Sequence, residues 1–344
     1  MLKVAINGFG RIGRTAFKIA LDKHQSEAEI VAINDLGDAK TLAHLLKYDS
    51  NYGIWPHDVS NDDPSASLGT GNHIIIDQKP YLVLQEKEPQ KLPWKDLAVD
   101  VVIESTGRFT KGEQAKLHLQ AGAKKVVISA PVHGDGTETK TFLLGVNADN
   151  YDGEEVISNA SCTTNSVAPV AKAINDAFGI QKAMLTTVHA FTQDQNLQDG
   201  PHKDLRRARS AATNIVPTTT GAAISTTEVI PELKGKFDGR ALRVPVAVGS
   251  ISDFTFLLGK KVSVEEVNQA LKRASETDQY KGILAVTDEP IVSSDIVGRS
   301  ESAIVDLSLT QVVDGDMVKI FAWYDNEYGY SNRLIEQVIH VGKS

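Results

Sequence analysis

The chain begins with an apolar segment that runs into a glycine-rich turn: Leu2-Lys3-Val4-Ala5-Ile6-Asn7-Gly8-Phe9-Gly10-Arg11-Ile12-Gly13. The part up to Asn7 has the character of a strand, and residues 11–21 have the apolar spacing of a helix. Between them, Gly8 permits a tight turn, Gly10 lets the backbone approach a pyrophosphate, and Gly13 lets the helix pack on the strand. Because a helix N-terminus attracts negative charge, this order predicts a dinucleotide-binding turn.

A second predicted strand, Glu29 to Asn34, ends next to Asp35, about 20 residues beyond the glycine turn. A carboxylate at this place takes the ribose hydroxyls of NAD and repels the 2′-phosphate of NADP. Two plainer interpretations stay open: the glycines form only a structural turn, and Asp35 caps a loop.

The rest of the first half continues to alternate strands and helices. Val99 to Glu104 and Lys125 to Ser129 are predicted strands, and a helix is predicted between them at residues 111–121. Such alternation predicts βαβ units and a parallel, Rossmann-type sheet. Residues 51–95 are predicted to form loops and hairpins that decorate the sheet, because they hold Trp55-Pro56, Asp63-Pro64 and Gly69-Thr70-Gly71-Asn72.

The second half has a different pattern, which predicts an α+β domain with a largely antiparallel sheet. The predicted strands are Arg240 to Val248, Phe254 to Leu258, Ala303 to Val312 and Met317 to Trp323, and helices are predicted near 263–274 and 331–341. We expect an α/β fold with two domains: a dinucleotide-binding domain at 1–161, and a catalytic and oligomerisation domain at 162–325. The C-terminal helix, at 326–344, is expected to return to the first domain.

Composition sets further bounds. A chain of 344 residues suggests about two domains, and its net charge of −8 disfavours nucleic acid or a membrane surface as partner. No apolar run approaches the roughly 20 residues of a membrane span, and the N-terminus does not read as a signal peptide. One cysteine and no export signal predict the reducing cytoplasm. No spacing of Cys, His, Asp and Glu predicts a metal site.

That single cysteine, Cys162, follows small and hydroxylic residues and precedes an apolar helical pattern that ends at Gly179. Ser161 is a predicted N-cap, so Cys162 lies in the first turn, where the helix dipole favours a thiolate. We predict that Cys162 is a catalytic nucleophile, although most single cysteines are inert core residues. Pro169, inside the pattern, predicts a kink or a later start of the helix.

His189 is the predicted base, because it ends the β-branched run Met184 to Val188 and so projects from a strand end. A surface histidine or a hydrogen-bonded core histidine is the plainer interpretation, and His202 is a competitor. His202 belongs to a basic cluster, residues 201–209. With Thr218-Thr219-Thr220-Gly221 and Arg243, the cluster offers guanidinium, hydroxyl and amide donors for a phosphorylated substrate.

From end to end, the chain resembles the phosphorylating glyceraldehyde-3-phosphate dehydrogenase family. The resemblance rests on residues 5–14, 44–50 and 104–110, on Ser161 to Asn165, on His202 to Arg209 and Ile215 to Ala223, and on Arg243-Val244-Pro245 and Trp323-Tyr324-Asp325-Asn326-Glu327. It implies that Cys162 attacks the aldehyde carbon of glyceraldehyde 3-phosphate and that His189 accepts the proton as hydride leaves for the nicotinamide. Inorganic phosphate would then attack the thioester and give 1,3-bisphosphoglycerate.

The resemblance also implies binding roles. The substrate's own phosphate would be held by Thr192, Asp194 and Arg243, and the attacking phosphate by Ser161, Thr163, Arg207, Thr220 and Gly221. The cofactor would be held by Gly8, Gly10, Arg11, Ile12, Gly13, Asp35, Ser105, Thr106, Ser129, Asn326 and Tyr330, with Asn326 on the nicotinamide carboxamide and Tyr330 near the ring. The family is a homotetramer in which a basic loop, here about 191–214, reaches a neighbour's cofactor.

Departures from the family pattern leave alternatives open. Val246-Ala247-Val248-Gly249 replaces a stretch that commonly carries a threonine and an asparagine, and Ser166 replaces a usual second cysteine. Gly200 opens space for the 2′-phosphate of NADP, while Asp35 still favours NAD. The alternative functions are an erythrose-4-phosphate dehydrogenase and an inactive NAD-binding interaction protein.

Overall fold

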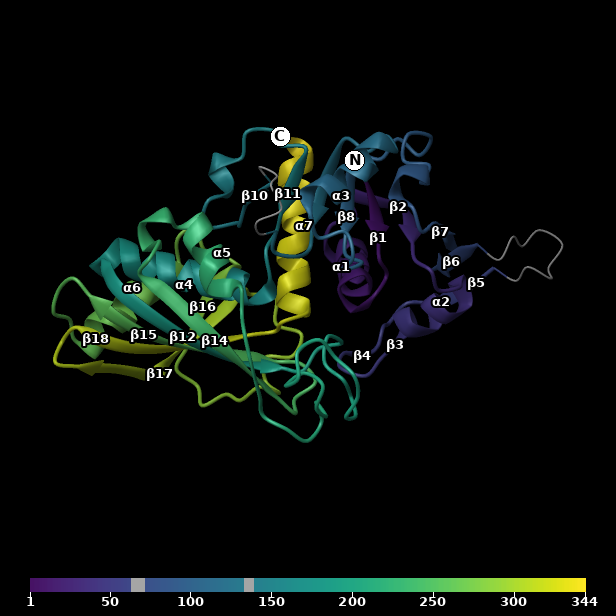
Figure 1. Cartoon of the computed structure of the whole chain (residues 1–344). Helices are drawn as coiled ribbons and strands as arrows, with labels where there is room; N and C mark the ends of the chain where they lie inside the picture. The colour runs from purple at the N-terminus through teal and green to yellow at the C-terminus, as the bar shows by residue number, and fades with distance from the viewer. Residues whose placement is uncertain (63–71, 133–138) are drawn as a thin grey trace. The chain divides into compact units, whose positions relative to one another are not determined.

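The computed structural model describes residues 1–62, 72–132 and 139–344. The predicted turns at Asp63-Pro64 and Gly69-Thr70-Gly71 lie outside these residues. The chain divides into two compact units: unit 1 comprises Met1–Thr141, Asn150–Asn159 and Leu334–Ser344, and unit 2 comprises Phe142–Asp149 and Ala160–Arg333 (Figure 1). The sequence placed the division after residue 161 and began the returning segment at 326. The contacts divide the chain after Asn159 and begin that segment at Leu334.

Unit 1 is built on a sheet whose described strands run in the order β10-β11-β9-β8-β1-β2-β7-β6-β5. Its strands are β1 (Leu2–Asn7), β2 (Ala28–Asn34), β5 (Val59–Asn61), β6 (His73–Ile76), β7 (Lys79–Leu84), β8 (Val101–Glu104), β9 (Lys125–Ile128), β10 (Lys140–Thr141) and β11 (Val156–Ser158). All neighbours from β10 to β7 are parallel, and β6 is antiparallel to both β5 and β7. The parallel, Rossmann-type sheet is confirmed.

The segment at 51–95 does more than decorate this sheet. Its hairpin is present, but β7 pairs in parallel with β2, so the segment adds three strands to the sheet. The smaller pair of β3 (Tyr48–Asp49) and β4 (Gly53–Ile54) stays separate. The sequence pattern missed the extension because β5 to β7 are short and polar residues interrupt them.

Helices accompany the strands of unit 1: α1 (Arg11–Lys23), α2 (Ala39–Lys47), α3 (Gly112–Gln120), and the short turns η1 (Pro89–Lys91) and η2 (Ala148–Asn150), of which η2 falls mostly in unit 2. α1 begins at the residue that the glycine turn predicts. A buried cluster fills one side of the sheet, with Trp94 fully enclosed among Val99, Val102 and Val126. Burial of such apolar side chains supplies the main driving force that holds the strands in register.

Unit 2 is built on a mixed sheet in the order β13-β14-β12-β15-β18-β17-β16. Its strands are β12 (Ile180–Ala190), β13 (Val216–Thr218), β14 (Phe237–Val244), β15 (Ser250–Leu258), β16 (Leu284–Thr287), β17 (Ala303–Val313) and β18 (Met317–Tyr324). Four of its pairs are antiparallel, and β12–β14 and β16–β17 are parallel. The largely antiparallel sheet is confirmed. The strand predicted at 240–248 ends at Val244, because the backbone turns there, with the N–H of Val246 bonded to the carbonyl of Val244.

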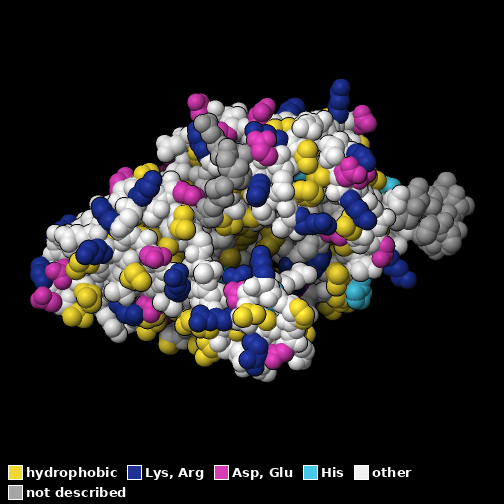
Figure 2. Space-filling model, in the orientation of Figure 1, with side chains coloured by type: hydrophobic (Ala, Val, Ile, Leu, Met, Phe, Trp, Pro, Cys, Tyr) yellow, Lys and Arg dark blue, Asp and Glu magenta, His cyan; other side chains and the backbone are white. Residues whose placement is uncertain are grey.

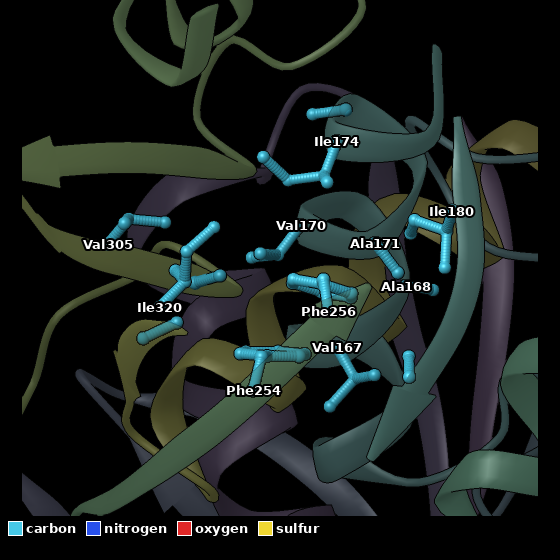
Figure 3. Close-up of a cluster of buried hydrophobic side chains, with 14 of the residues drawn as sticks. Val167, Ala168, Val170, Ala171, Ile174, Ile180, Phe254, Phe256, Val305 and Ile320 are labelled. Atoms are coloured by element: carbon cyan, nitrogen blue, oxygen red, sulfur yellow. The ribbon is translucent and has the colours of Figure 1, made fainter. Parts of the chain in front are cut away.

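Helix α4 (Cys162–Phe178) is the central helix of unit 2. Its residues Val167, Val170 and Ile174 pack toward Phe254 and Phe256 of β15 and toward Ile320 of β18 (Figure 3). These side chains are buried, so the apolar stripe read from the sequence is the face that meets the sheet. The helix runs through Pro169 and begins at Cys162, so the alternative of a later start is wrong.

The other helices of unit 2 are α5 (Ala222–Val229), η3 (Pro231–Leu233) and α6 (Val264–Ser275). The last helix, α7 (Tyr328–Lys343), begins in unit 2 and ends in unit 1. On the face shown in Figure 2, Lys and Arg side chains are interspersed with Asp and Glu. Among the described residues, no helix has the length and apolar character that crossing a membrane requires.

Candidate active site

The glycine turn joins β1 to α1 in unit 1. Of its three glycines, only Gly10 has open space where a side chain would lie. A Cβ at Gly8, which has φ +97°, would lie 2.5 Å from the backbone nitrogen of Thr106, and a Cβ at Gly13 would collide with the carbonyl oxygen of Gly8. At Gly10, the N-cap of α1, a Cβ would meet no atom within 4 Å. Gly8 and Gly13 are therefore required by packing, and Gly10 faces the open space over the helix N-terminus. This is the arrangement that admits a pyrophosphate.

Asp35 follows β2 and holds this turn in place. One carboxylate oxygen accepts the N–H of Phe9 at 2.7 Å, and the other accepts the N–H of Gly37 at 2.9 Å. The loop-capping interpretation of Asp35 is therefore correct. It does not exclude the ribose role, because each carboxylate oxygen has a second lone pair.

The other predicted cofactor residues of unit 1 lie where neighbouring strands end. Ser105 follows β8 and donates its hydroxyl to the carbonyl of Gly8 at 2.8 Å. Ser129 follows β9, and its N–H bonds to the carbonyl of Glu104. β8 and β2 pair with opposite edges of β1, so the strand order changes direction at β1. These residues therefore lie at the switch point, which is where open α/β sheets bind ligands. Arg11 and Ile12 are the first two residues of α1, and the Arg11 guanidinium pairs with Asp49 at 3.1 Å.

Thr106 is fixed by a buried acidic residue that the sequence analysis did not single out. One carboxylate oxygen of Glu104 accepts both the N–H of Thr106, at 2.9 Å, and its hydroxyl, at 2.5 Å. The other accepts from Asn7 at 2.6 Å and lies 3.1 Å from Nε2 of His118. Trp94 donates to Nδ1 of His118, so the imidazole proton is on Nε2 and faces Glu104. The sequence feature that could have identified Glu104 as a site residue is its position at the end of a buried strand.

In unit 2, α4 presents Cys162 at its first turn. Ser161 is the N-cap, with its hydroxyl accepting the N–H of Thr164 at 3.1 Å, as the sequence predicts. A serine cap satisfies one of the free amides at the helix start and contributes about 1 kcal/mol. Cys162 is half-buried. The thiol is therefore fixed on a rigid helix at the end where the dipole is positive.

His189 is the second-last residue of strand β12, and its side chain contacts this thiol. The Cys162 Sγ atom lies 3.4 Å from Nε2 of His189, and Nδ1 of His189 lies 2.7 Å from the carbonyl oxygen of Ala190. The carbonyl can only accept, so this contact favours the tautomer with the proton on Nδ1 and the lone pair of Nε2 facing the thiol, although the Arg243 guanidinium, which can only donate, also lies 3.0 Å from Nδ1. A thiol and a base joined in this way form the pair that nucleophilic catalysis requires.

Burial acts against ionisation of the pair. It raises the pKa of the Cys162 thiol, and the nearby Arg243 guanidinium and a hydrogen bond from Thr163 only partly offset it. Burial, together with the charge of Arg243, lowers the pKa of His189 from 6.5 to about 3. Burial therefore opposes the effect that the helix start is expected to have on this thiol, and both shifts favour the uncharged forms of the pair.

Arg243 lies beside His189 because β14 and β12 are parallel and in register at these two residues. Its Nη1 atom is 3.0 Å from Nδ1 of His189, 3.1 Å from the carbonyl of Ala190 and 3.3 Å from the hydroxyl of Thr192. Its Nε atom is buried, and no acceptor lies within reach among the described residues. A buried guanidinium with an unused donor is a site for an anion. The structure thus brings Thr192 and Arg243 together with the thiol–imidazole pair.

The remaining predicted anion ligands are arranged differently from the expectation. Asp194 and Arg207, which the resemblance assigns to different phosphates, form an ion pair with each other. Arg207 also lies 3.6 Å from Asp204. Thr220 accepts the N–H of Ala222, and Gly221 is the N-cap of α5. Thr163 uses its hydroxyl toward Tyr324 at 3.0 Å.

Asn326 is held by the segment that departs from the family pattern. Its Oδ1 atom accepts the N–H of Gly249 at 3.0 Å and the hydroxyl of Ser250 at 3.2 Å. Both bonds go to the oxygen, so Nδ2 is left to donate elsewhere. Gly249 has φ +95°, a conformation that glycine adopts more readily than other residues. Tyr330 is buried and donates its hydroxyl to the carbonyl of Ala160 at 3.0 Å.

Among residues 1–62, 72–132 and 139–344, no group of three or more His, Cys, Asp or Glu side chains is placed to hold a metal ion.

Two family models match the chain. The glyceraldehyde 3-phosphate dehydrogenase NAD binding domain matches residues 2–112, and the glyceraldehyde 3-phosphate dehydrogenase C-terminal domain matches residues 161–326. The chain is also 56% identical to the glyceraldehyde-3-phosphate dehydrogenase of Mycolicibacterium smegmatis over 349 aligned positions, covering 100% of this chain and 99% of the relative.

Relatives with that name also come from more distant bacteria. The glyceraldehyde-3-phosphate dehydrogenase of Streptomyces coelicolor is 53% identical and that of Geobacillus stearothermophilus is 52% identical, each over 99% of this chain and 98% of its own length. Both halves of the chain and its whole length thus match proteins of one kind, and the chain belongs to the glyceraldehyde-3-phosphate dehydrogenase family.

Proposed function

We propose that the chain catalyses the phosphorylating oxidation of D-glyceraldehyde 3-phosphate to 1,3-bisphosphoglycerate with reduction of NAD. The observation that carries the proposal is the 3.4 Å contact between Cys162 Sγ and His189 Nε2, with an anion-binding Arg243 3.0 Å from the same imidazole. The relatives that share 52–56% of this sequence carry the name of that enzyme. Unit 1 would serve as the dinucleotide-binding domain and unit 2 as the catalytic domain.

The residues of unit 1 fit a dinucleotide. Gly10 leaves the space above the N-terminus of α1 open, and Gly8 and Gly13 allow the backbone to turn tightly beneath it. Asp35 and Ser105 bond to this turn, and Ser129 lies at the end of β9, the strand next to β8. NAD, when bound, supplies the acceptor for two electrons and one hydrogen. In unit 2, Nδ2 of Asn326 is the donor that would hold its carboxamide.

Acylation would begin at the thiol. Cys162 passes its proton to Nε2 of His189, Sγ bonds to the aldehyde carbon, and the carbonyl oxygen takes that proton from His189 to give a hemithioacetal. His189, neutral again, then accepts the hydroxyl proton as the carbon gives up a hydride, for which bound NAD would be the acceptor, and a thioester on Cys162 remains. Arg243 and Thr192 hold the phosphate of the substrate, which keeps the aldehyde carbon next to the sulfur.

Deacylation needs inorganic phosphate as nucleophile. An oxygen of the phosphate bonds to the thioester carbon, the carbon–sulfur bond breaks, and Cys162 leaves as a thiolate that recovers its proton. Ser161, Thr163, Arg207, Thr220 and Gly221 are the proposed ligands of this phosphate. Arg207 would exchange its ion pair with Asp194 for the anion, because a guanidinium nitrogen that is paired with a carboxylate is not available to a phosphate.

Two wider proposals accompany the activity. We propose a homotetramer, because unit 2 exposes large apolar side chains on the segment after β12 and on α5, namely Leu197, Leu205, Ile215 and Ile224. The native mass measured by light scattering tests it, and a monomer at micromolar concentration would refute it. We also propose that the protein works in the cytoplasm, since a catalytic cysteine must stay reduced.

An absorbance assay tests the activity. Purified protein with NAD, phosphate and D-glyceraldehyde 3-phosphate is expected to form NADH, and the rate is expected to vanish when phosphate and arsenate are both left out. Erythrose 4-phosphate in place of the triose tests the neighbouring activity, and NADP in place of NAD tests the effect of Gly200. Tight NAD binding without turnover of either sugar phosphate would contradict the proposal.

Substitution of the nucleophile provides the first prediction. Cys162→Ser is expected to lower kcat by on the order of 10³-fold or more, because a serine hydroxyl is far less acidic than a thiol. NAD affinity, measured by titration calorimetry, is expected to stay within about 2-fold of the unsubstituted protein, because the glycine turn is untouched. Retained turnover would remove Cys162 from the mechanism.

A further inference from the structure

A buried tyrosine connects the two halves of the thiol–imidazole pair. Tyr324 ends β18, is 1% exposed, and places its hydroxyl 3.0 Å from Oγ1 of Thr163 and 2.9 Å from Oγ1 of Thr187. Thr163 is the residue after Cys162, and Thr187 lies two residues before His189 on β12. One hydroxyl group thus joins the start of α4 to the strand that carries the base.

The direction of these bonds follows from the number of protons. Each of the three hydroxyls has one proton to donate. Burial raises the pKa of Tyr324, so its hydroxyl stays protonated and both donates and accepts. A hydrogen bond from the Thr163 hydroxyl lowers the pKa of the Cys162 thiol. If Thr163 gives its proton to the sulfur, Tyr324 must donate to Thr163. Thr187 then has two acceptors in reach, the Tyr324 oxygen at 2.9 Å and the carbonyl of Ile251 at 3.5 Å, and the Tyr324 oxygen is the nearer.

Tyr324 also contacts the base directly. Its ring lies edge-on to the imidazole of His189, with the ring centroids 5.9 Å apart and the planes at 73°. A buried aromatic side chain thus packs against the imidazole, in addition to the contacts of its nitrogens with Ala190 and Cys162.

We propose that Tyr324 is a positioning residue for the reaction, which directs the Thr163 hydroxyl onto the Cys162 sulfur and fixes the distance between that sulfur and His189. The proposal rests on the proposed function, in which Cys162 is the nucleophile. It goes beyond that function because Tyr324 exchanges no proton with the reacting groups and acts through Thr163, Thr187 and the packing of the His189 ring. When the hydroxyl is removed, Thr163 and Thr187 lose their common partner, and the sulfur loses an oriented donor.

Alkylation of Cys162 by iodoacetamide is the readout, because it reports the thiolate without substrate or cofactor. The chain has one cysteine, so the rate belongs to Cys162 alone. Tyr324→Phe is expected to slow alkylation at pH 7 by about 2- to 10-fold, the net worth of one hydrogen bond, and to move the pH profile to higher pH. Tyr280→Phe is the matched control. Tyr280 is 4% exposed in the same unit, and its hydroxyl has no partner among the described residues.

Thr187 supplies a second pair of variants in case Tyr324→Phe fails to fold. Thr187→Val removes the hydroxyl at nearly constant shape and is expected to shift the profile in the same direction, whereas Thr187→Ser keeps the hydroxyl and is expected to retain the original profile. Profiles of Tyr324→Phe and Thr187→Val that coincide with Tyr280→Phe would overturn the proposal. A protein that alkylates as predicted but forms no NADH would contradict the proposed function and leave the role of Tyr324 intact.

Discussion

At the scale of single residues, the site is an uncharged pair held next to a permanent positive charge. Burial raises the pKa of Cys162 and lowers that of His189, and Arg243 lowers both. The positive charge of Arg243 therefore favours the thiolate of Cys162 and disfavours the protonated imidazole of His189. An incoming phosphate would neutralise the guanidinium, which lets His189 hold its proton more easily.

The second prediction follows from the sign of these effects. Arg243→Gln removes the positive charge, so the pKa of Cys162 rises and less thiolate is present at neutral pH. The alkylation rate of Cys162 is expected to fall at pH 7, with the half-maximum of the profile at higher pH. The KM for the aldehyde substrate is expected to rise by about 10- to 100-fold, the worth of a charged hydrogen bond.

Arg240→Gln is the control for this prediction. Arg240 lies on the same strand, β14, and is exposed, and its nearest bond, at 3.5 Å, goes to the carbonyl of Gly239. Its substitution changes net charge equally and is expected to leave the profile and the KM unchanged. If the two variants behave alike, the effect of Arg243 is one of overall charge, and its place beside His189 has no special role.

At the scale of elements, two glycines of the turn between β1 and α1, Gly8 and Gly13, are needed for packing, and the third, Gly10, faces open space. The motif G-x-G-x-x-G predicts a separate role for each of its three glycines. The packing of β1, α1 and β8 supplies the reason for two of them, because the carbonyl of Gly8 and the backbone of Thr106 fill the places where side chains at Gly13 and Gly8 would lie.

The third prediction uses that difference. Gly13→Ala is expected to lower the free energy of unfolding by about 1–3 kcal/mol or more, because its Cβ would collide with the carbonyl of Gly8. Gly10→Ala is expected to unfold at nearly the same urea concentration, since Gly10 has an extended backbone with φ −69° and open space around it. The same Gly10 variant is expected to bind NAD at least about 10-fold more weakly, as the methyl group fills the space for the pyrophosphate.

Urea unfolding and calorimetric titration of both variants check this. Equal losses of stability in the two variants would contradict the packing argument. Undiminished NAD affinity in Gly10→Ala would contradict the placement of the pyrophosphate.

At the scale of the whole molecule, one helix is shared by both units. α7 starts in unit 2, where Tyr330 bonds to Ala160, and from Leu334 onward it belongs to unit 1. Its C-terminal half buries Leu334, Ile335, Val338 and Val341, and Lys125 donates to the carbonyl of Val341. The end of the chain thus helps to form the core of the unit in which the chain began.

The fourth prediction measures that contribution. Leu334→Ala is expected to lower the free energy of unfolding by about 2–5 kcal/mol, because the side chain is fully buried. Lys343→Ala, a substitution on the same helix, removes an exposed ion pair with Glu27 from the loop before β2 and is expected to cost about 1 kcal/mol or less. Chemical unfolding of both variants gives the comparison. A loss in Lys343→Ala as large as that in Leu334→Ala would show that the helix is held by its surface and not by its core.

Much of the fold follows from local sequence. The strand–glycine turn–helix order fixed the start of α1, the apolar stripe fixed the buried face of α4, and Ser161 fixed its first residue. Local sequence did not predict the strands whose pairing partners are distant. β5 to β7 join the sheet because β7 pairs with the edge of β2, and β14 ends earlier than predicted because the backbone turns after Val244.

For the site, the sequence by itself determined the reactive groups: a single cysteine at a helix start, a histidine at a strand end, and arginine and threonine donors for an anion. Their chemistry is a property of residue type and local position. Tertiary structure alone decided how they meet. It placed Arg243 beside His189 through parallel strand register, linked Thr163 to Thr187 through Tyr324, and buried the thiol so that its pKa rises. The physical reason is that contacts between residues far apart in the chain, and the loss of water around them, arise only when the chain has folded.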